Sequence, residues 1–361
     1  MLRVATLSTL FPTAARPGFG LFVARQTLGL AAREGVSVEV VAATGVRPWT
    51  FRRDAGIDTW ETLAVHRPGF VSLPGSGNAR RMAHAALASV RAIAPDVIDA
   101  EFFWPDGVAA MHLSRTLGIP FTVKARGSDI AHWGKVPKVR AQMLEAAEAA
   151  GGMVAVSAAL KRDMAALGMP EAKIEVHYTG VDQARFRPVP RTPGRTIVTV
   201  GNLVAVKGHG LLIEAMRLLP DAVLLVAGEG PERPALERRA GANVRFLGSV
   251  PHGEMPGLLA GADVMALASE REGLANAWVE ALACGTPVVI PDVGGAREVV
   301  DRPEAGRLAE RTPEAFADAI RALLDAPPER EAVRAAAVRF SWERNAAELE
   351  AHLRRVSAEG H

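Results

Sequence analysis

The sequence predicts an α/β protein built from two doubly wound domains, and three observations predict it. Short β-branched runs alternate with longer Ala-, Leu- and Arg-rich stretches, which is typical of parallel sheets covered by helices. One proline-rich segment, 181–194, interrupts this alternation, and a new first strand follows it. The length of 361 residues suits two domains of roughly 150 residues each.

The first domain is expected over residues 1–185. It begins with a buried strand, since Leu2, Val4 and Leu7 alternate with smaller residues. No run of about 18 apolar residues occurs in the sequence, so no segment is expected to span a membrane. The expected strands are 4–8, 38–42, 97–100, 121–124 and 153–156, and the expected helices are 21–33, 106–117 and 136–149.

The second domain is expected over residues 186–340, with strands at 197–200, 223–227, 244–247, 264–267 and 288–290. Amphipathic helices are expected at 313–324 and 330–349, and the segment 341–361 is expected to pack back on the first domain. Ligands of doubly wound sheets bind outside the carboxyl ends of the strands, so the two domains are expected to face each other across a cleft.

The composition limits the function. A net charge of +2 with scattered Arg and Lys lacks the basic stripe typical of nucleic-acid binding, so no nucleic-acid partner is expected. The nearest basic clusters are Arg80, Arg81 and Arg91, and Lys135, Lys138 and Arg140. They fit either solvated helix faces or peripheral contact of the first domain with an anionic membrane. The single cysteine, Cys284, excludes an intrachain disulfide and fits the cytoplasm.

The most informative stretch runs from Ser269 to Val289. We expect a helix from near Leu274 to just before Gly285, with Glu272 in the preceding loop and Glu280 about two turns along the helix. Free N–H groups of the first helical turn can point at an anion. Two alternatives remain open from the residues alone: a structural ion pair for Glu280 and a solvated loop carboxylate for Glu272.

This stretch resembles the family 4 glycosyltransferases of the GT-B fold, whose signature has two glutamates separated by seven residues, followed by Ala-Cys-Gly-Thr-Pro-Val-Val. The resemblance implies that Glu280 binds the ribose hydroxyls of a nucleotide-sugar donor and that Glu272 lies against the donor sugar. It also implies contacts to the sugar and diphosphate from the backbone of Gly273, Leu274, Ala275 and Asn276.

Further family-like segments extend over the second half. The stretch 200–209 resembles the entry loop of the donor domain, with Gly201 in the loop and Lys207 on the diphosphate. Asn202 stands where the family usually has an arginine, so one cation is missing. Gly228 and Gly230 resemble the Gly-x-Gly-Pro turn, and Leu247 belongs to a loop that reads the nucleotide base. Without the resemblance, Lys207 could simply begin an exposed helix.

The first half carries matching loops as well. Gly18 and Gly20 follow strand one, in a loop that the family uses beside the donor phosphate and the acceptor; a turn with positive φ is the alternative. Arg126 stands in place of a family histidine, with Asp129 expected to orient it, which favours binding of sugar or phosphate oxygens over proton transfer. Trp104, Asp106 and Asp129 are expected on the acceptor side, although the aromatic residues could instead fill the cleft floor.

The resemblance implies a metal-independent, retaining hexosyltransferase, with Glu272, Lys207 and Arg126 as catalytic residues. A UDP- or GDP-sugar would be the donor, with no cofactor and no metal. The acceptor would be a glycan or lipid-linked molecule of bacterial cell-envelope or exopolysaccharide biosynthesis, and the enzyme would be cytoplasmic or peripheral at the inner membrane face. Two alternatives stay open: a nucleotide-sugar 2-epimerase of the same fold, and a degenerate non-catalytic binding protein. A glycoside hydrolase is disfavoured, because the motif puts Glu280 at the nucleotide.

Overall fold

The computed structural model describes residues 1–48, 56–190 and 194–359. The chain divides into two compact units: unit 1 is Met1–Thr179 with Trp342–His361, and unit 2 is Gly180–Ser341. The sequence placed these boundaries at 185/186 and 340/341. Of the proline-rich segment expected as the linker, residues 191–193 lie outside the described residues.

Unit 1 contains an eight-stranded sheet in the order β10-β9-β8-β7-β1-β2-β5-β4. All neighbours pair in parallel except β4 and β5, which are antiparallel. The strands are β1 Leu2–Leu7, β2 Val36–Val41, β4 Ile57–Trp60, β5 Leu63–His66, β7 Val97–Ala100, β8 Phe121–Ala125, β9 Gly152–Ala155 and β10 Ile174–Val176. A separate pair consists of β3 Thr44–Val46 and β6 Gly69–Val71.

Helices cover this sheet because their apolar residues recur at helical spacing. In α2 the buried residues include Ala79, Met82, Ala86 and Val90, which lie on one face. The helices of unit 1 are α1 Leu21–Ala31, α2 Asn78–Ile93, α3 Val108–Leu117, α4 Ser128–Ala131, α5 Pro137–Ala149, α6 Ala158–Leu167 and α14 Trp342–Glu359, with short helical turns at Phe103–Gly107, Trp133–Lys135 and Glu171–Lys173.

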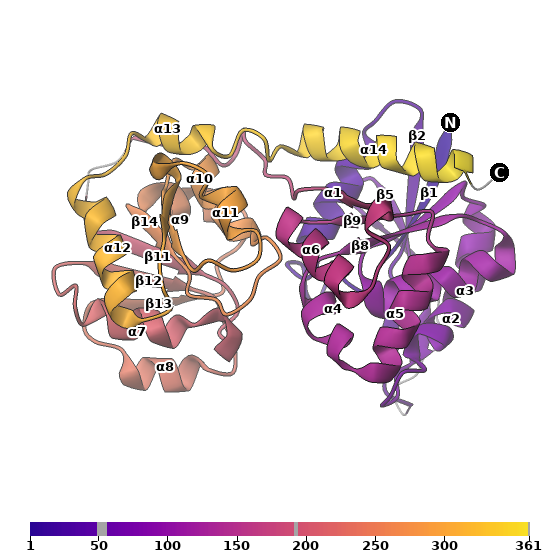
Figure 1. Cartoon of the computed structure of the whole chain (residues 1–361), viewed down its shortest axis with the longest axis horizontal. Helices are drawn as coiled ribbons and strands as arrows, with labels where there is room; N and C mark the ends of the chain where they lie inside the picture. Colours follow the sequence, from indigo (N-terminus) through magenta and orange to yellow (C-terminus); the bar gives the residue numbers. More distant parts are fainter. Residues whose placement is uncertain (49–55, 191–193, 360–361) are drawn as a thin grey trace. The chain divides into compact units, whose positions relative to one another are not determined.

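The C-terminal helix α14 belongs to unit 1, although it follows unit 2 in the sequence (Figure 1). Its buried Leu349, Leu353 and Val356 share a core cluster with residues of β1, β2 and β7. The Asn345 amide donates a hydrogen bond of 2.6 Å to the Tyr178 carbonyl, which holds the start of the helix. Apolar burial and polar contacts therefore both attach α14 to the first sheet.

Unit 2 contains a six-stranded, fully parallel sheet in the order β13-β12-β11-β14-β15-β16. The strands are β11 Thr196–Val200, β12 Val223–Ala227, β13 Val244–Gly248, β14 Val264–Ala266, β15 Val288–Ile290 and β16 Gly306–Leu308. The helices are α7 His209–Met216, α8 Arg233–Arg239, α9 Met255–Gly261, α10 Asn276–Ala283, α11 Ala296–Val299, α12 Pro313–Asp325 and α13 Arg330–Ala335, with short helical turns at Ala205–Lys207 and Pro303–Ala305.

One element differs from the sequence prediction. The helix expected at 330–349 is two helices, α13 and α14, separated by residues 336–341. At this break the Val181 N–H donates to the Phe340 carbonyl at 2.8 Å, and Val181 bridges to Ser341. Phe340 is fully buried. The break therefore lies where the chain passes from unit 2 back to unit 1, and helical periodicity alone does not reveal it.

Each sheet reverses its strand order at a first strand, β1 in unit 1 and β11 in unit 2. Crevices at such switch points are where doubly wound sheets bind ligands.

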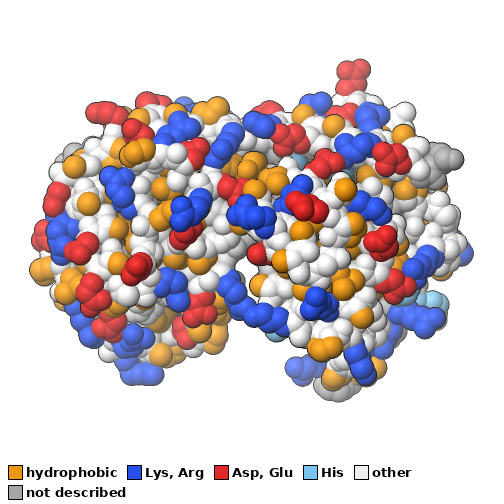
Figure 2. Space-filling model, in the orientation of Figure 1, with side chains coloured by type: hydrophobic (Ala, Val, Ile, Leu, Met, Phe, Trp, Pro, Cys, Tyr) orange, Lys and Arg blue, Asp and Glu red, His pale blue; other side chains and the backbone are white. Residues whose placement is uncertain are grey.

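Among the described residues, no helix has both the length and the apolar composition of a membrane span. Figure 2 shows Lys and Arg side chains interspersed with Asp and Glu on the visible face of each unit, in keeping with the net charge of +2.

Candidate functional site

The loops at the carboxyl ends of β11, β12, β14 and β15 lie in direct contact, and glycines permit this. A Cβ added to Gly228 would lie 1.9 Å from the Gly201 carbonyl oxygen. A Cβ added to Gly294 would lie 1.9 Å from the Glu272 carbonyl oxygen, and Gly294 has a positive φ of 53°. Any larger residue at either position would force the loops apart. Close backbone packing therefore builds the base of the candidate site in unit 2.

Lys207 and Glu272 meet on these loops. The Lys207 Nζ lies 2.6 Å from the Glu272 Oε1, and the side chains are 25% and 11% exposed. The Glu270 N–H also donates to the Val206 carbonyl at 2.8 Å, so the two loops are joined by backbone as well. The cation is thus held at a fixed place beside the switch point, where it can bind an anionic group.

Helix α10 begins directly after this loop and carries Glu280 in its second turn. Its N-cap is Ala275, and no side chain caps it, so N–H groups of the first turn remain available to an anion. The Glu280 Oε1 lies 3.5 Å from the His252 Nε2, and the His252 ring packs edge-on against Phe186. The carboxylate of Glu280 is 17% exposed, which leaves it within reach of a polar ligand.

The remaining predicted residues of unit 2 lie on the strand ends and loops of the same sheet. Asn202 is exposed, and its carbonyl lies 3.3 Å from the ring of buried His209. Burial, opposed by that contact and aided by Lys207, lowers the pKa of His209 to about 4. The Gly273 carbonyl accepts from the Gly295 N–H at 2.8 Å. Leu274 is buried, Asn276 opens α10, Gly230 packs against the Leu203 backbone, and Leu247 is 43% exposed near the end of β13.

In unit 1 the predicted Arg126 follows β8 and is paired with Glu101, which follows β7. The Arg126 Nη2 donates to the Glu101 carboxylate, and its Nε donates to the Glu101 carbonyl at 3.3 Å. The Glu101 side chain is fully buried, whereas that of Arg126 is 10% exposed. The guanidinium also lies over the Phe22 ring at 4.6 Å from its centroid. Arg126 is therefore a rigid cation whose outer part reaches solvent.

The structure corrects the expected partner of Arg126. Asp129 was expected to orient its guanidinium, but the Asp129 carboxylate binds the backbone N–H groups of Phe103, Arg126, Gly127 and Ile130. Asp129 is fully buried and shapes the loop instead. Glu101 takes the orienting position because it lies on the neighbouring strand end.

Asp106, which the sequence placed on the acceptor side, is fully buried as well. It accepts from the Thr9 N–H at 3.0 Å and from the Thr9 hydroxyl at 2.9 Å. Burial raises the pKa of Asp106 to about 7, against the lowering effect of the two Thr9 hydrogen bonds. Its carboxyl thus joins the loop after β1 to the helical turn Phe103–Gly107.

A buried polar network lies beneath Arg126, and sequence reasoning missed it. The Lys124 ammonium contacts the Gln26 side chain and lies 2.5 Å from the His177 Nδ1, while Gln26 donates to Glu101. Burial lowers the pKa of Lys124 and His177, and burial next to Glu101 raises that of Asp99. One signal was available: Lys124 is a charged residue within an apolar strand, where it needs partners.

The predicted glycines of unit 1 differ from each other. A Cβ on Gly20, whose φ is 69°, would lie 2.4 Å from the Leu10 carbonyl, so this glycine is required by the turn that starts α1. Gly18 is exposed and faces open space.

Trp104 is 6% exposed and packs on Trp133, with ring centroids 4.2 Å apart. Across the described ranges, no group of three or more His, Cys, Asp and Glu side chains could hold a metal ion.

Matches to known families extend over almost the whole chain. Residues 18–185 match the family described as Glycosyltransferase Family 4, and residues 181–340 match Glycosyl transferases group 1. The two matches follow one another in the order of units 1 and 2. The chain belongs to the family 4 glycosyltransferases. It is an enzyme of the GT-B fold, with two Rossmann-like domains.

Relatives and solved structures agree with this membership. A Bacillus subtilis protein named as a glycosyltransferase of teichuronic acid biosynthesis, TuaC, is 27% identical over 88% of each chain. A Mycobacterium tuberculosis GDP-mannose-dependent phosphatidylinositol dimannoside mannosyltransferase is 35% identical over 48% of this chain and 50% of that protein. Sucrose-phosphate synthase from Thermosynechococcus elongatus shares the fold with a TM-score of 0.84 at 19% identity, covering 99% of this chain and all of the other.

A second solved structure is Anabaena HepE in complex with UDP and glucose. Its TM-score is 0.78 at 17% identity, and the match covers 98% of this chain and all of that one. The likeness is in the fold of the two domains. The family and the fold class expected from the sequence are thus confirmed.

Proposed function

We propose that this glycosyltransferase moves a hexosyl unit from a UDP- or GDP-sugar to a glycan or lipid-linked acceptor in bacterial cell-envelope or exopolysaccharide biosynthesis. One observation carries the proposal: the Lys207 Nζ lies 2.6 Å from the Glu272 Oε1. Glu272 belongs to the loop that leads into the uncapped N-terminus of α10. A cation and free N–H groups at the switch point of a parallel sheet suit a diphosphate.

In this proposal Lys207 and the first turn of α10 stabilise the negative charge that develops on the leaving diphosphate. Both are fixed before reaction, so they stabilise charge without reorganisation. Glu280 receives the ribose hydroxyls, with His252 as its neighbour at 3.5 Å. Glu272 accepts hydrogen bonds from the donor sugar. The positive groups come from the chain itself, which supports transfer without a bound metal.

We assign Arg126 of unit 1 to sugar or phosphate oxygens. Its pairing with Glu101 fixes the guanidinium, and an arginine does not act as a proton carrier, so Arg126 serves as an anion ligand. We also propose retention of the anomeric configuration without a covalent glycosyl-enzyme. Asp106, Asp129 and Glu101 are fully buried and already bonded, which leaves them poorly placed as nucleophiles.

The names of two relatives support an envelope role. TuaC is named for teichuronic acid biosynthesis, and the mycobacterial relative is named as acting on a phosphatidylinositol mannoside with GDP-mannose. Both names describe glycosyl transfer to envelope molecules, one of them a lipid. The mycobacterial name favours a donor with a guanosine base, and the two names together favour an acceptor that is a glycan or carries a lipid.

The test is a transfer assay with UDP- and GDP-sugars, lipid-linked and free glycan acceptors, and excess EDTA. NMR of the product would give the anomeric configuration. We expect transfer from one donor series, unaffected by EDTA, with the donor configuration retained. Donor turnover without any acceptor, giving a 2-epimer, would identify an epimerase. Nucleotide binding without transfer to any acceptor would identify a binding protein.

A further inference from the structure

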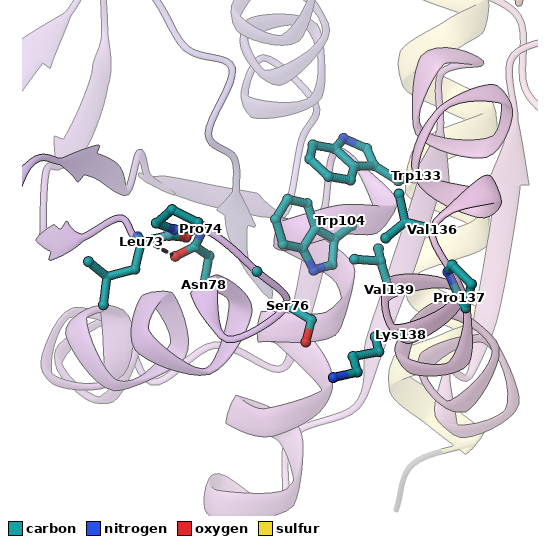
Figure 3. Close-up of a pocket in the computed structure, with 11 residues that line it drawn as sticks. Leu73, Pro74, Ser76, Asn78, Trp104, Trp133, Val136, Pro137, Lys138 and Val139 are labelled. Carbon is teal, nitrogen blue, oxygen red and sulfur yellow. Dashed lines mark hydrogen bonds between the residues drawn. The ribbon is translucent and has the colours of Figure 1, made fainter.

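Unit 1 contains a pocket of about 590 Å³ that no residue of the proposed donor site lines. Its wall comes from the loop before α2, from Trp104, and from the start of α5 (Figure 3). Apolar side chains dominate this wall, and no acidic residue is among them. The lining residues are Leu73, Pro74, Gly75, Ser76, Asn78, Trp104, Trp133, Val136, Pro137, Lys138 and Val139.

One end of the pocket is suited to an anion. Val136 is the N-cap of α5, a helix of 13 residues, and no side chain caps it. The first turn of α5 contains no acidic residue, and Lys138 is exposed there without an acidic partner among the described residues. Pro137 has no N–H, and the Val139 and Arg140 N–H groups bond the Val136 carbonyl, so this turn offers an anion the Lys138 N–H and the Lys138 ammonium, together with the positive end of the helix dipole.

A second, independent feature points to a ligand. The indole Nε1 of Trp104 is buried and has no hydrogen-bond partner within the described part of the chain, and the residue is only 6% exposed. Figure 3 shows the nitrogen-bearing edge of this ring turned toward Ser76 and Lys138. A buried donor without an acceptor is costly, so a bound group with an acceptor oxygen would remove a real penalty.

The rest of the pocket is suited to an aliphatic chain. Leu73 and Val136 are 41% and 38% exposed, although apolar residues of this size usually lie inside. Trp104 and Trp133 form a tilted aromatic pair beside them. Asn78 offers little to a sugar, because its amide already bonds both backbone groups of Leu73. The pocket thus joins an apolar surface to one anion site, and apart from Lys138 the polar side chains that line it are Ser76 and Asn78.

We propose that this pocket binds the lipid segment of the acceptor, an aliphatic chain that carries a phosphate. The chain packs on Leu73, Val136 and the tryptophan pair, and the phosphate lies at Lys138, the α5 N-terminus and the Trp104 N–H. This inference rests on the proposed function and makes it specific: the acceptor is lipid-linked, and unit 1 recognises the lipid as well as the sugar.

The test uses decyl phosphate below its micelle concentration, with inorganic phosphate as the apolar-free comparison, in calorimetric titration of the full chain. We expect saturable 1:1 binding of decyl phosphate and much weaker binding of phosphate. Val136→Asp places a favoured capping residue at the α5 N-cap, so the helix keeps its stability while the anion site gains a negative charge. We expect this variant and Lys138→Gln to weaken binding about tenfold or more.

Lys161→Gln in α6 is the matched control and should bind as the wild type does. The same variants are titrated with UDP and GDP, which should bind unchanged. Decyl phosphate binding that survives Val136→Asp would overturn the assignment. A second result would also overturn it: the wild type binds anionic phosphatidylglycerol vesicles, Val136→Asp does not, and decyl phosphate fails to compete with the vesicles. If the wild type binds decyl phosphate but neither UDP nor GDP, the donor proposal alone is refuted.

Discussion

The Lys207 Nζ lies 2.6 Å from the Glu272 Oε1, and the two residues are 65 positions apart in the sequence. The contact joins the loop after β11 to the loop after β14, the two strands that flank the switch point of unit 2. A mobile lysine would lose side-chain entropy on binding a diphosphate, whereas a lysine already held by a carboxylate loses less. The pair therefore prepares a cation for an anionic ligand.

This pairing predicts a selective effect of Lys207→Met. The variant should lose about 1.5–3 kcal/mol of binding free energy for UDP or GDP, the usual range for hydrogen bonds to charged groups. The binding free energy for UMP or GMP should fall clearly less, since the Lys207 ammonium is assigned to the diphosphate. Calorimetric titration measures both. The control is Arg238→Met, which removes an exposed cation of α8; equal losses for mono- and diphosphates would contradict the assignment of Lys207.

Glu280→Ala should also weaken nucleotide binding by about 1.5–3 kcal/mol, because a partly buried carboxylate would no longer accept the ribose hydroxyls. A 2′,3′-dideoxy nucleotide should bind the wild type and the variant alike, since it lacks those hydroxyls. Glu331→Ala, an exposed carboxylate of α13, is the control. Unchanged affinity for UDP and GDP in Glu280→Ala would show that the residue only pairs with His252.

The Glu101–Arg126 pair should behave as a buried ion pair in denaturation experiments. Glu101→Gln leaves a largely buried guanidinium without its partner and should lower the free energy of unfolding of unit 1 by about 3–5 kcal/mol. The double variant Glu101→Gln/Arg126→Gln should recover part of that loss. Urea denaturation monitored on unit 1 measures the coupling. Additive losses in the two single variants would mean that the pair contributes no interaction energy.

His209 should make unit 2 less stable in acid. Its pKa in the folded protein, about 4, lies below the ordinary histidine value of 6.5, so the unfolded chain binds the proton more strongly between these values. The stabilisation that comes from keeping His209 neutral is therefore fully present above pH 6.5 and is lost as the pH falls toward 4. Between pH 7.5 and 5 the loss should be about 1–2 kcal/mol from this residue.

The comparison variant is His209→Gln, which cannot titrate in this range. Its free energy of unfolding should fall less than that of the wild type between pH 7.5 and 5. The difference between the two proteins isolates His209 from every other titrating group. Parallel pH profiles would show that the buried ring is protonated as easily as a ring in water.

The alternation of strands and helices was predictable because each strand is a short apolar run and each helix a longer amphipathic one. The strands Val97–Ala100, Val223–Ala227 and Val288–Ile290 have the predicted bounds. The split of α13 from α14 was not predictable, since it depends on the contact of Val181 with Phe340 and Ser341. Sequence periodicity reports local geometry, and this break is fixed by residues far away in the chain.

The candidate site was predictable where a motif encodes it and not where it depends on packing. Glu272, Glu280 and Lys207 were named through a resemblance carried by local motifs, and the structure brings Lys207 and Glu272 into contact, while their roles stay predictions. Glu101 was missed, because its partner is set by the parallel pairing of β7 with β8, which brings Glu101 and Arg126 together. The role of Asp129 was misjudged for the same reason: nearness in sequence to Arg126 suggested a side-chain contact that the loop does not make.

Calorimetric titration with UDP, GDP and ADP, in the presence of EDTA, tests whether the protein binds a donor nucleotide without a metal. We expect UDP or GDP to bind with micromolar affinity at one site, and Glu280→Ala and Lys207→Met to weaken that binding. ADP should bind more weakly. Failure of all three nucleotides to bind the wild-type protein, or binding that appears only when a divalent metal is added, would contradict the account.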